Sequence, residues 1–394
     1  MKLYDSLSRT FKTLPQGHDA ITIYVCGVTP YDTTHLGHAY TYLVFDGLIR
    51  YLESQGGTVR YVQNVTDIDD DILRKSADLG LTWDELADRE TAQFLADLRA
   101  LNTRMPDLYP KASEETEAMI DIIERLVADE LAYVRNGSVY YHVASDPNFG
   151  KLSQYDYATM LRTANERGNH PDDPNKEDPL DFVLWQAAQP GEPTWPSPWG
   201  AGRPGWHIEC SAMAMRHLGP TLDIHGGGAD LLFPHHECEI AQSENSSGQR
   251  PFVQIWLHIA MVRMEGEKMS KSLGNMVFIR DLLQQYDADA VRAYLYAHHY
   301  RISFEWNEAE MAAAARRSAT WQRALAHEVE HDDEATVSTL ADMFHHAIQE
   351  DLNTPTALKV LDELADGILI GQLGQSGQAA LAGLSRTIGF RLAV

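Results

Sequence analysis

A strand, a helix and a second strand follow one another near the start of the chain, and this order constrains the fold more than any other feature. Residues 20–27 (AITIYVCG) are apolar and β-branched and end in a glycine, and residues 58–65 have a similar apolar, β-branched character. Between them, residues 32–57 carry apolar side chains at helical spacing. Strand, helix and strand at this spacing form a βαβ unit, so we predict a doubly wound parallel sheet with ligands at the carboxyl ends of its strands. Residues 26–38 and 64–67 fall at two such ends.

The rest of the chain continues this α/β pattern and then becomes helical. The expected helices cover residues 82–99 and 114–131, and the expected strands cover 138–142, 222–225 and 252–264. Residues 162–204 are rich in Pro, Gly, Asp and Asn, but they contain an apolar run at 182–185 that favours burial. We therefore interpret them as an inserted, loop-rich region and not as a linker. From about residue 308 the chain is expected to be helical, with Asn353 or Thr354 capping the penultimate helix.

The composition limits the class of protein. The chain has 394 residues, 44% hydrophobic and 23% charged, which is typical of a globular protein of two or three domains. Its 57 Asp and Glu against 32 Lys and Arg give a formal net charge of -25, so a nucleic-acid partner would need a local basic patch. Three cysteines cannot form a disulfide framework. The sequence has neither a signal-peptide pattern nor an apolar run of about 18 residues, so we expect a cytoplasmic protein without a membrane partner.

The motif HLGH is the first candidate for binding a nucleotide. It places His35, Gly37 and His38 at the opening of the first helix, where imidazoles and helix N–H groups suit phosphate. The glycine lets a ligand come close to the backbone. This four-residue pattern also occurs by chance, so on its own it is weak evidence for nucleotide binding.

The motif KMSKS, far later in the chain, is a second candidate for binding a nucleotide. Lys268 and Lys271 alternate with the small hydroxyl residues Ser270 and Ser272 in a loop that ends in glycine. Two lysines at this spacing can neutralise charge on a triphosphate as it breaks between its α- and β-phosphates. A solvated basic turn is the commoner role for a lysine pair, but its occurrence together with HLGH argues against that role here.

The pairing of these two motifs resembles the signature of class I aminoacyl-tRNA synthetases. The resemblance is strongest to the cysteinyl-tRNA synthetase family and its shorter relative, the cysteine ligase of mycothiol biosynthesis. The segments that carry it span the chain up to about residue 310: YVCGVTPYD at 24–32, NVTDIDD at 64–70, GWHIECS at 205–211, HGGGAD at 225–230, FPHHE at 233–237 and the KMSKS loop. The resemblance implies a Rossmann-like class I catalytic core with an inserted subdomain and a C-terminal α-helical bundle.

The resemblance also suggests how the chain is divided. We expect the first half of the catalytic core at 1–100, the inserted subdomain at 101–204, the second half of the core with the KMSKS loop at 205–280, a connecting stem-contact region at 281–310 and the helical bundle at 311–394, with no tRNA-anticodon domain after it.

Two cysteines, a histidine and a glutamate form a candidate metal site. Cys26, Cys210, His235 and Glu239 offer a sulfur, nitrogen and oxygen donor set that suits zinc, and the last two lie on one face if their segment is helical. From the residues alone, buried thiols are the simpler interpretation of the two cysteines. The resemblance reverses this preference and implies one zinc ion per chain. In the resembling synthetases this zinc binds the thiolate of the substrate cysteine and so rejects serine.

Two features depart from the family patterns. Cys238 stands where the synthetase pattern usually has asparagine, and it is an alternative to Glu239 as the fourth ligand. The mycothiol ligases usually lack that glutamate, so its presence favours the synthetases. We interpret His236 as a neighbour of the metal site or a core residue.

The resemblance implies further binding residues. Trp206 would flank the cysteine, while Thr29, Thr66 and Asp230 would hold its ammonium and carboxylate groups. His225, Gly226, Gly227 and Gly228 would form a platform that a nucleotide can approach closely. ATP is expected to bind with Mg²⁺, and the acidic run at 67–71 is interpreted as an exposed turn, with magnesium binding as its alternative.

The sequence leaves alternatives for the acceptor to which the activated cysteine is transferred. The first reaction would join L-cysteine and ATP into cysteinyl adenylate. Residues 311–394 contain 6 Lys and Arg against 11 Asp and Glu, which does not suit tRNA, and the insertion at 160–193 resembles the mycothiol-type ligase. We therefore expect a monomeric ligase that transfers cysteine to the amine of glucosaminyl-inositol. The alternatives are a cysteine–tRNA ligase that charges tRNA(Cys) and an inactive paralogue that acts as a binding module.

Overall fold

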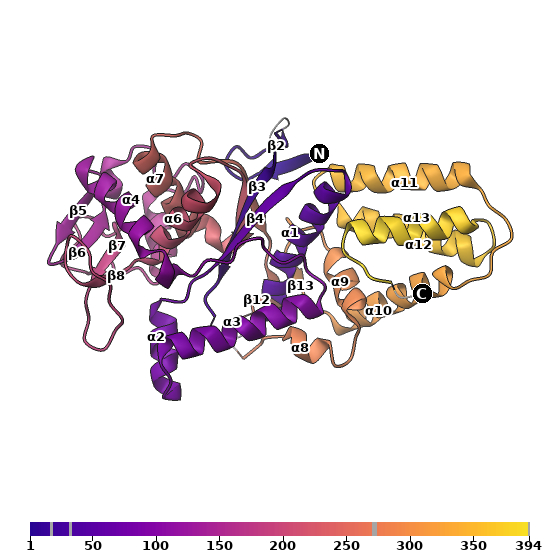
Figure 1. The fold of residues 1–394 in the computed structure, drawn as a ribbon, viewed down its shortest axis with the longest axis horizontal. Coiled ribbons are helices and arrows are strands. Elements are labelled where there is room, and N and C mark those ends of the chain that lie inside the picture. Colours follow the sequence, from indigo (N-terminus) through magenta and orange to yellow (C-terminus); the bar gives the residue numbers. More distant parts are fainter. Residues whose placement is uncertain (16–18, 31–33, 270–273, 393–394) are drawn as a thin grey trace.

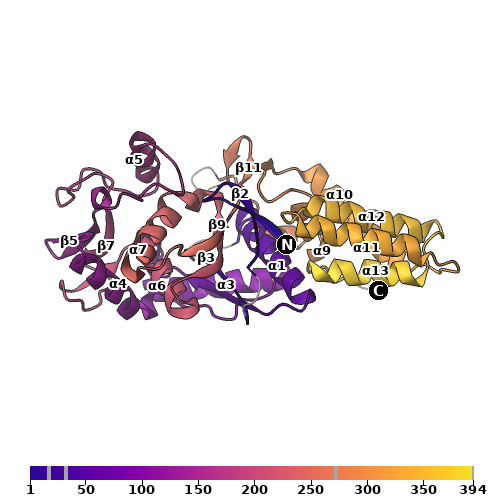
Figure 2. The same cartoon turned by 90° about the horizontal axis from the view of Figure 1, so that it is seen from above.

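The computed structural model describes residues 1–15, 19–30, 34–269 and 274–392, and it has three parts in a row (Figure 1). A parallel sheet with its helices lies in the middle. An antiparallel sheet with its own helices lies at one end, and a set of C-terminal helices lies at the other. Figure 2 shows the same order from above.

The central sheet has four parallel strands in the order β10-β9-β3-β4. Their bounds are β3 Ile21–Val28, β4 Val59–Val65, β9 Leu222–Gly228 and β10 Val253–Ile259. Helix α1, Leu36–Ser54, joins β3 to β4 as predicted, and α6, Trp206–Leu218, and α7, Glu237–Ser247, flank β9 in the chain. The prediction of a parallel α/β core is confirmed, and the carboxyl ends of β3, β4 and β9 lie beside one another.

A long excursion leaves the sheet after β4 and returns at β9. It contains the helices α2 Asp70–Leu79, α3 Trp83–Ala100, α4 Thr116–Ala128 and α5 Tyr157–Asn165, the short turns η1 Ala112–Glu114 and η2 Val143–Ser145, and the strands β5 Ala132–Arg135, β6 Ser138–Tyr141, β7 Phe182–Ala187 and β8 Gly202–Pro204. These strands form an antiparallel sheet in the order β5-β6-β7-β8. The predicted burial of residues 182–185 is confirmed for Phe182, Leu184 and Trp185, because β7 lies inside this sheet, whereas Val183 is half-buried.

Two expectations for local structure are wrong. The single strand expected at 252–264 is divided into β10 and β11, Val262–Met264, which belongs to a small sheet with β12, Glu267–Lys268, and β13, Phe304–Glu305. Both halves are apolar, so the pattern could not reveal the break at Ala260, whose N–H donates to the Tyr300 carbonyl at 2.7 Å. The acidic run is also not simply an exposed turn: Asp67 is buried and accepts hydrogen bonds from the N–H and the hydroxyl of Ser113.

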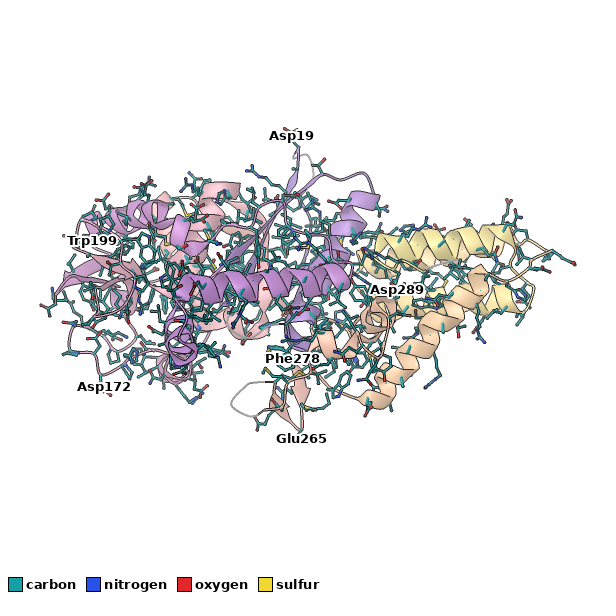
Figure 3. All side chains as sticks on the ribbon, turned by 60° about the horizontal axis from the view of Figure 1, so that its bottom comes forward. Asp19, Asp172, Trp199, Glu265, Phe278 and Asp289 are labelled. Atoms are coloured by element: carbon teal, nitrogen blue, oxygen red, sulfur yellow. The ribbon has the colours of Figure 1, made fainter. Side chains whose placement is uncertain are left out.

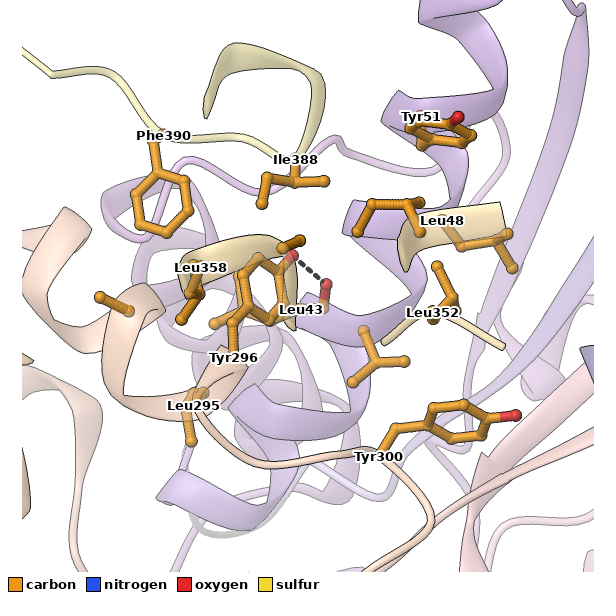
Figure 4. Packing of buried hydrophobic residues seen from close by; sticks show 14 of the residues in the cluster. Leu43, Leu48, Tyr51, Leu295, Tyr296, Tyr300, Leu352, Leu358, Ile388 and Phe390 are labelled. Carbon is orange, nitrogen blue, oxygen red and sulfur yellow. Dashed lines mark hydrogen bonds between the residues drawn. The ribbon is translucent and has the colours of Figure 1, made fainter. Parts of the chain in front are cut away.

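The C-terminal part is helical, as predicted. It contains α8 Ile279–Leu282, α9 Ala288–Tyr296, α10 Glu308–Leu325, α11 Glu334–Gln349, α12 Thr354–Leu369 and α13 Gln375–Thr387, and the N-terminus adds the hairpin of β1 Lys2–Asp5 and β2 Thr10–Thr13. Asn353 caps α12, which confirms that prediction. The core is continuous from the sheet into these helices, and Figure 4 shows the junction, where the Tyr296 hydroxyl donates to the Leu43 carbonyl at 2.6 Å. Within the described ranges, every helix is too short or too polar to cross a bilayer.

Candidate active site

The carboxyl end of β3 carries Cys26 into the interior. Gly27, the next residue, lies so close to β4 that a Cβ atom on it would stand 1.6 Å from the main-chain oxygen of Asn64. The Gly27 N–H donates to the Asn64 side-chain oxygen at 2.7 Å, and the pairing of β3 with β4 shifts register between Val25 and Val28. Only glycine fits here, and this close approach fixes the end of the strand that presents the Cys26 thiol.

The four residues predicted as metal ligands come together in one buried cluster. The Cys26 sulfur lies 3.7 Å from the Cys210 sulfur and 3.4 Å from a carboxylate oxygen of Glu239, and the same oxygen lies 3.1 Å from Nε2 of His235. The four donor atoms all lie within 4.8 Å of one another. They come from β3, from α6 and from the segment that joins the turn η4, Leu232–His236, to α7.

A second set of four donors overlaps the first. It replaces Cys210 and His235 by His225 and His236, and it shares Cys26 and Glu239. Nε2 of His225 lies 3.4 Å from the Cys26 sulfur, and Nε2 of His236 lies 3.3 Å from it. His225 was expected to face a nucleotide, but it is fully buried here. Among the described residues, Cys238 belongs to neither set, which favours Glu239 over it as the fourth ligand.

The chemistry of this cluster suits a divalent cation. Burial raises the pKa of the Cys26 thiol and of the Glu239 carboxyl well above their usual ranges and lowers the pKa of His235 well below its own. One oxygen of Glu239 has no hydrogen-bond partner among the described residues. Without a cation these groups would be neutral and poorly satisfied, whereas a zinc ion would stabilise the thiolates and the carboxylate and use the imidazole as a neutral donor. The residues present therefore fit zinc.

Two neighbours of the cluster, Asn64 and His207, were not singled out from the sequence. Asn64 is buried, accepts from the Cys210 thiol at 3.6 Å and donates to the Thr66 hydroxyl at 3.2 Å. His207 lies with its Nδ1 2.9 Å from Nδ1 of His235, and the Trp206 ring stacks on the His235 ring at 4.5 Å. The only sequence signal for Asn64 and His207 was their place inside motifs that were quoted for other residues.

The residues expected to bind the amino acid surround the same strand ends. Thr66 is buried directly after β4, and its N–H donates to the Val28 carbonyl at 3.3 Å. The hydroxyl of Thr29 interacts with the carboxylate of Asp69, whose pKa burial raises to about 6. Asp230 lies in the turn η3, Ala229–Leu231, just after β9, and its side chain is 32% exposed. Their roles toward cysteine stay a prediction.

The HLGH motif forms the start of α1. His35 caps the helix by accepting a hydrogen bond from the Gly37 N–H at 3.1 Å, and its ring stacks on His38 with the centroids 3.8 Å apart. The segment after the KMSKS loop runs beside it, because the Leu36 N–H donates to the Val277 carbonyl at 2.8 Å and His35 forms a bridge with Phe278. Figure 3 shows Phe278 on the same side of the molecule as Glu265, at the tip of the β11–β12 hairpin that leads into the loop.

The fold thus places the HLGH motif beside the segment that follows the KMSKS loop. Ser270, Lys271 and Ser272 lie outside the described residues, as does the side chain of Lys268, so their predicted contacts with ATP stay a prediction.

Two of the three glycines after His225 are required by packing inside the protein. A Cβ on Gly226 would stand 2.0 Å from the Leu257 carbonyl oxygen of β10, and one on Gly227 would stand 2.8 Å from the Leu231 side chain. Gly228 is the one of the three that is partly exposed. The absence of side chains at the first two is therefore already required by packing, and a nucleotide platform at these glycines stays a prediction.

Comparison with known proteins gives a family and a set of relatives. The family model described as the catalytic domain of class I (C) tRNA synthetases matches residues 12–316. A protein from Thermobifida fusca, named L-cysteine:1D-myo-inositol 2-amino-2-deoxy-alpha-D-glucopyranoside ligase, is 44% identical over 372 residues, which cover 94% of this chain and 89% of the relative. A protein of the same name from Nocardiopsis dassonvillei is 42% identical over 395 residues, which cover 100% of this chain and 96% of the relative.

Solved structures support the fold. The Mycobacterium tuberculosis methionyl-tRNA synthetase in complex with methionyl-adenylate superposes with a TM-score of 0.65 at 14% identity, covering 94% of this chain and 89% of that chain. The Agrobacterium radiobacter LeuRS in its ternary complex superposes with a TM-score of 0.66 at 11% identity, covering 96% and 85% of the two chains. At such low identity the likeness concerns the fold alone.

Proposed function

The chain belongs to the class I cysteinyl-tRNA synthetase family, and from this membership we propose that it is an ATP- and zinc-dependent ligase that activates L-cysteine and transfers it to the amine of glucosaminyl-inositol. The observation that carries the proposal is the near full-length identity of 44% and 42% to two proteins that share one ligase name. The buried cluster of two thiols, an imidazole and a carboxylate supports the choice of cysteine as the substrate.

The metal cluster would select the amino acid. Cys26, Cys210, His235 and Glu239 would hold zinc, and the bound ion supplies a soft Lewis acid that binds the thiolate of cysteine in preference to the hydroxyl of serine. Trp206, stacked on His235, would close one side of the amino-acid pocket. Thr29 and Thr66 would orient the carboxylate of cysteine, and Asp230 would bind its ammonium group.

The activation step would need positioning and charge stabilisation from the protein. A carboxylate oxygen of cysteine would attack the α-phosphorus of ATP, the bond to the β-phosphate would break, and pyrophosphate would leave. His35, Gly37 and His38 would bind the phosphates at the start of α1, with Lys268, Lys271 and the two loop serines on the other side. In the second step the acceptor amine attacks the adenylate carbonyl, and AMP leaves as the amine loses a proton.

The identity of the acceptor distinguishes an amino-sugar ligase from a cysteine–tRNA ligase. Both named relatives carry the amino-sugar ligase name. The acidic balance of residues 311–394, with 6 basic against 11 acidic side chains, also disfavours a tRNA surface in the helical part. The presence of Glu239 still favours charging of tRNA(Cys), so the two acceptors need a direct test. The inactive paralogue is disfavoured by the complete donor cluster. A monomeric state stays a prediction.

The test of the function is a single-turnover transfer assay. Purified enzyme is loaded with radiolabelled cysteine and ATP, and glucosaminyl-inositol and tRNA(Cys) are offered in parallel. We expect label to pass to the amino sugar and not to tRNA. Transfer to tRNA alone would contradict the proposal, and failure to form the adenylate at all would favour the inactive paralogue.

A further inference from the structure

An arginine of the inserted region contacts Asp230, the residue proposed to bind an ammonium group. Nη1 of Arg167 donates to the main-chain oxygen of Asp230 at 2.9 Å and lies 3.2 Å from its Oδ2. One guanidinium nitrogen therefore holds both the backbone and the side chain of the same residue. The two residues are far apart in the chain and come from different parts of the fold, since Arg167 follows α5 and Asp230 follows β9.

The backbone at Arg167 is held close to Asp230 by its own contacts. Helix α5 ends with a turn in which the N–H groups of Arg167 and Asn169 both donate to the Ala164 carbonyl, at 2.9 and 3.1 Å. Ala164 is buried in a small apolar cluster with Leu180 and Phe233, and Phe233 lies in η4, directly after the turn that carries Asp230. The arginine is thus anchored to the same segment that its side chain contacts.

The other side of the Asp230 carboxylate lies beside Gly228, which has no side chain. A Cβ atom on this glycine would stand 2.6 Å from Oδ1 of Asp230, so the carboxylate occupies space that any other residue at position 228 would fill. Oδ2 faces Arg167 and Oδ1 lies over the end of β9. Arg167 therefore holds this carboxylate, and the absence of a side chain at Gly228 leaves room for the orientation that it adopts.

Arg167 could affect the binding of an ammonium group through its charge or through the orientation of Asp230, and the two effects have opposite signs. The side chains of Arg167 and Asp230 are 23% and 32% exposed, so solvent screens much of their attraction. If the arginine acted only through its charge, it would weaken the binding of a substrate ammonium group, and its removal would improve binding. If it acts by orientation, its removal leaves the carboxylate free to rotate and weakens binding.

We propose that Arg167 is a positioning residue that holds the Asp230 carboxylate in the orientation that receives the ammonium group of cysteine. The inserted region then takes part in amino-acid recognition although it lies outside the catalytic sheet. This inference rests on the proposed function and deepens it, because it adds a specificity-determining contact to the amino-acid pocket.

The test is cysteine-dependent ATP–pyrophosphate exchange by the Arg167→Gln variant of the full chain. We expect the KM for cysteine to rise about fivefold, which is the effect expected of one partly exposed charged hydrogen bond, while kcat and the KM for ATP stay unchanged. Both contacts of Arg167 come from a single nitrogen, so Arg167→Lys, which keeps a charged donor, should raise the KM for cysteine less than Arg167→Gln does. Arg162→Gln, an exposed arginine in α5, is the matched control and should leave all three parameters unchanged.

A double-variant cycle separates positioning from a general structural effect. Asp230→Asn should raise the KM for cysteine by itself, and Arg167→Gln should add nothing further in that background, because its partner is already altered. An unchanged or lowered KM for cysteine in Arg167→Gln, or a fully additive effect in the double variant, would overturn the inference. Absence of exchange by the unaltered enzyme would instead overturn the proposed function, so the two failures are distinguishable.

Discussion

Replacing Cys210 by serine should remove the metal from the purified protein and abolish cysteine-dependent pyrophosphate exchange. Cys210 belongs to only one of the two donor sets, and its sulfur lies 3.7 Å from that of Cys26. A serine hydroxyl is a poor zinc ligand at neutral pH, and loss of a direct ligand should cost more than the ~10–100-fold in metal affinity that loss of a supporting residue costs. Zinc content by elemental analysis, with one ion per chain expected in the unaltered protein, measures the effect directly.

Cys238→Ser is the matched control for this experiment. Cys238 is as buried as Cys210 and precedes a proposed ligand, but it lies in neither donor set among the described residues. We expect it to retain the metal and the exchange activity. Full zinc content in Cys210→Ser would contradict the assignment. If His236→Asn then lost the metal, the ion would occupy the second set, with Cys26, His225, His236 and Glu239 as its ligands.

The members of the candidate metal cluster could be predicted because they lie in segments that resemble the family's metal motif; their donor types alone left buried thiols as the simpler interpretation. Cys26, Cys210, His235 and Glu239 could be chosen by donor type and by resemblance before their distances were known, and the structure brings all four together. Arg167 could not be chosen in this way. It contacts Asp230 only because α5 packs on η4, and a contact between an irregular insertion and a strand end leaves no periodic pattern in the sequence.

The fold was predictable where periodicity was strong. The βαβ unit and the C-terminal helices follow from apolar spacing, and β3, β4 and α1 lie within a few residues of their expected bounds. Prediction failed where tertiary contacts decide. The break between β10 and β11 depends on the pairing of Ala260 with Tyr300, and the burial of Asp67 depends on donors from Ser113. Neither partner is close in sequence, so local patterns contain no information about them.

The largest expected effect on stability comes from Asp46, which joins the catalytic core to the helical part. Asp46 lies in α1, the helix that begins with the HLGH motif, and its carboxylate accepts a hydrogen bond from the fully buried Arg292 of α9. The same guanidinium donates to the carbonyls of Leu101 at 2.8 Å and Ile388 at 3.0 Å. One buried cation therefore links α1, the end of α3, α9 and the segment after α13. Asp46 is the carboxylate in contact with it, and the other oxygen of Asp46 accepts from Nε of Arg50 at 2.7 Å.

Asp46→Ala should lower the free energy of unfolding by roughly 3–5 kcal/mol, because it leaves the Arg292 charge buried without its partner. Urea denaturation followed by circular dichroism measures the loss. Arg74→Ala is the control, since its ion pair with Asp71 is exposed and should contribute less than about 1 kcal/mol. The double variant Asp46→Leu with Arg292→Met removes both charges of this pair, and we expect it to recover only part of the lost stability, because Arg50 and the Arg104 N–H still lose their acceptor. A loss in Asp46→Ala as small as that of the control would contradict this account. A double variant less stable than Asp46→Ala would instead mean that the hydrogen bonds from Arg292 to the carbonyls of Leu101 and Ile388 contribute more to the free energy of unfolding than the ion pair of Arg292 with Asp46 does.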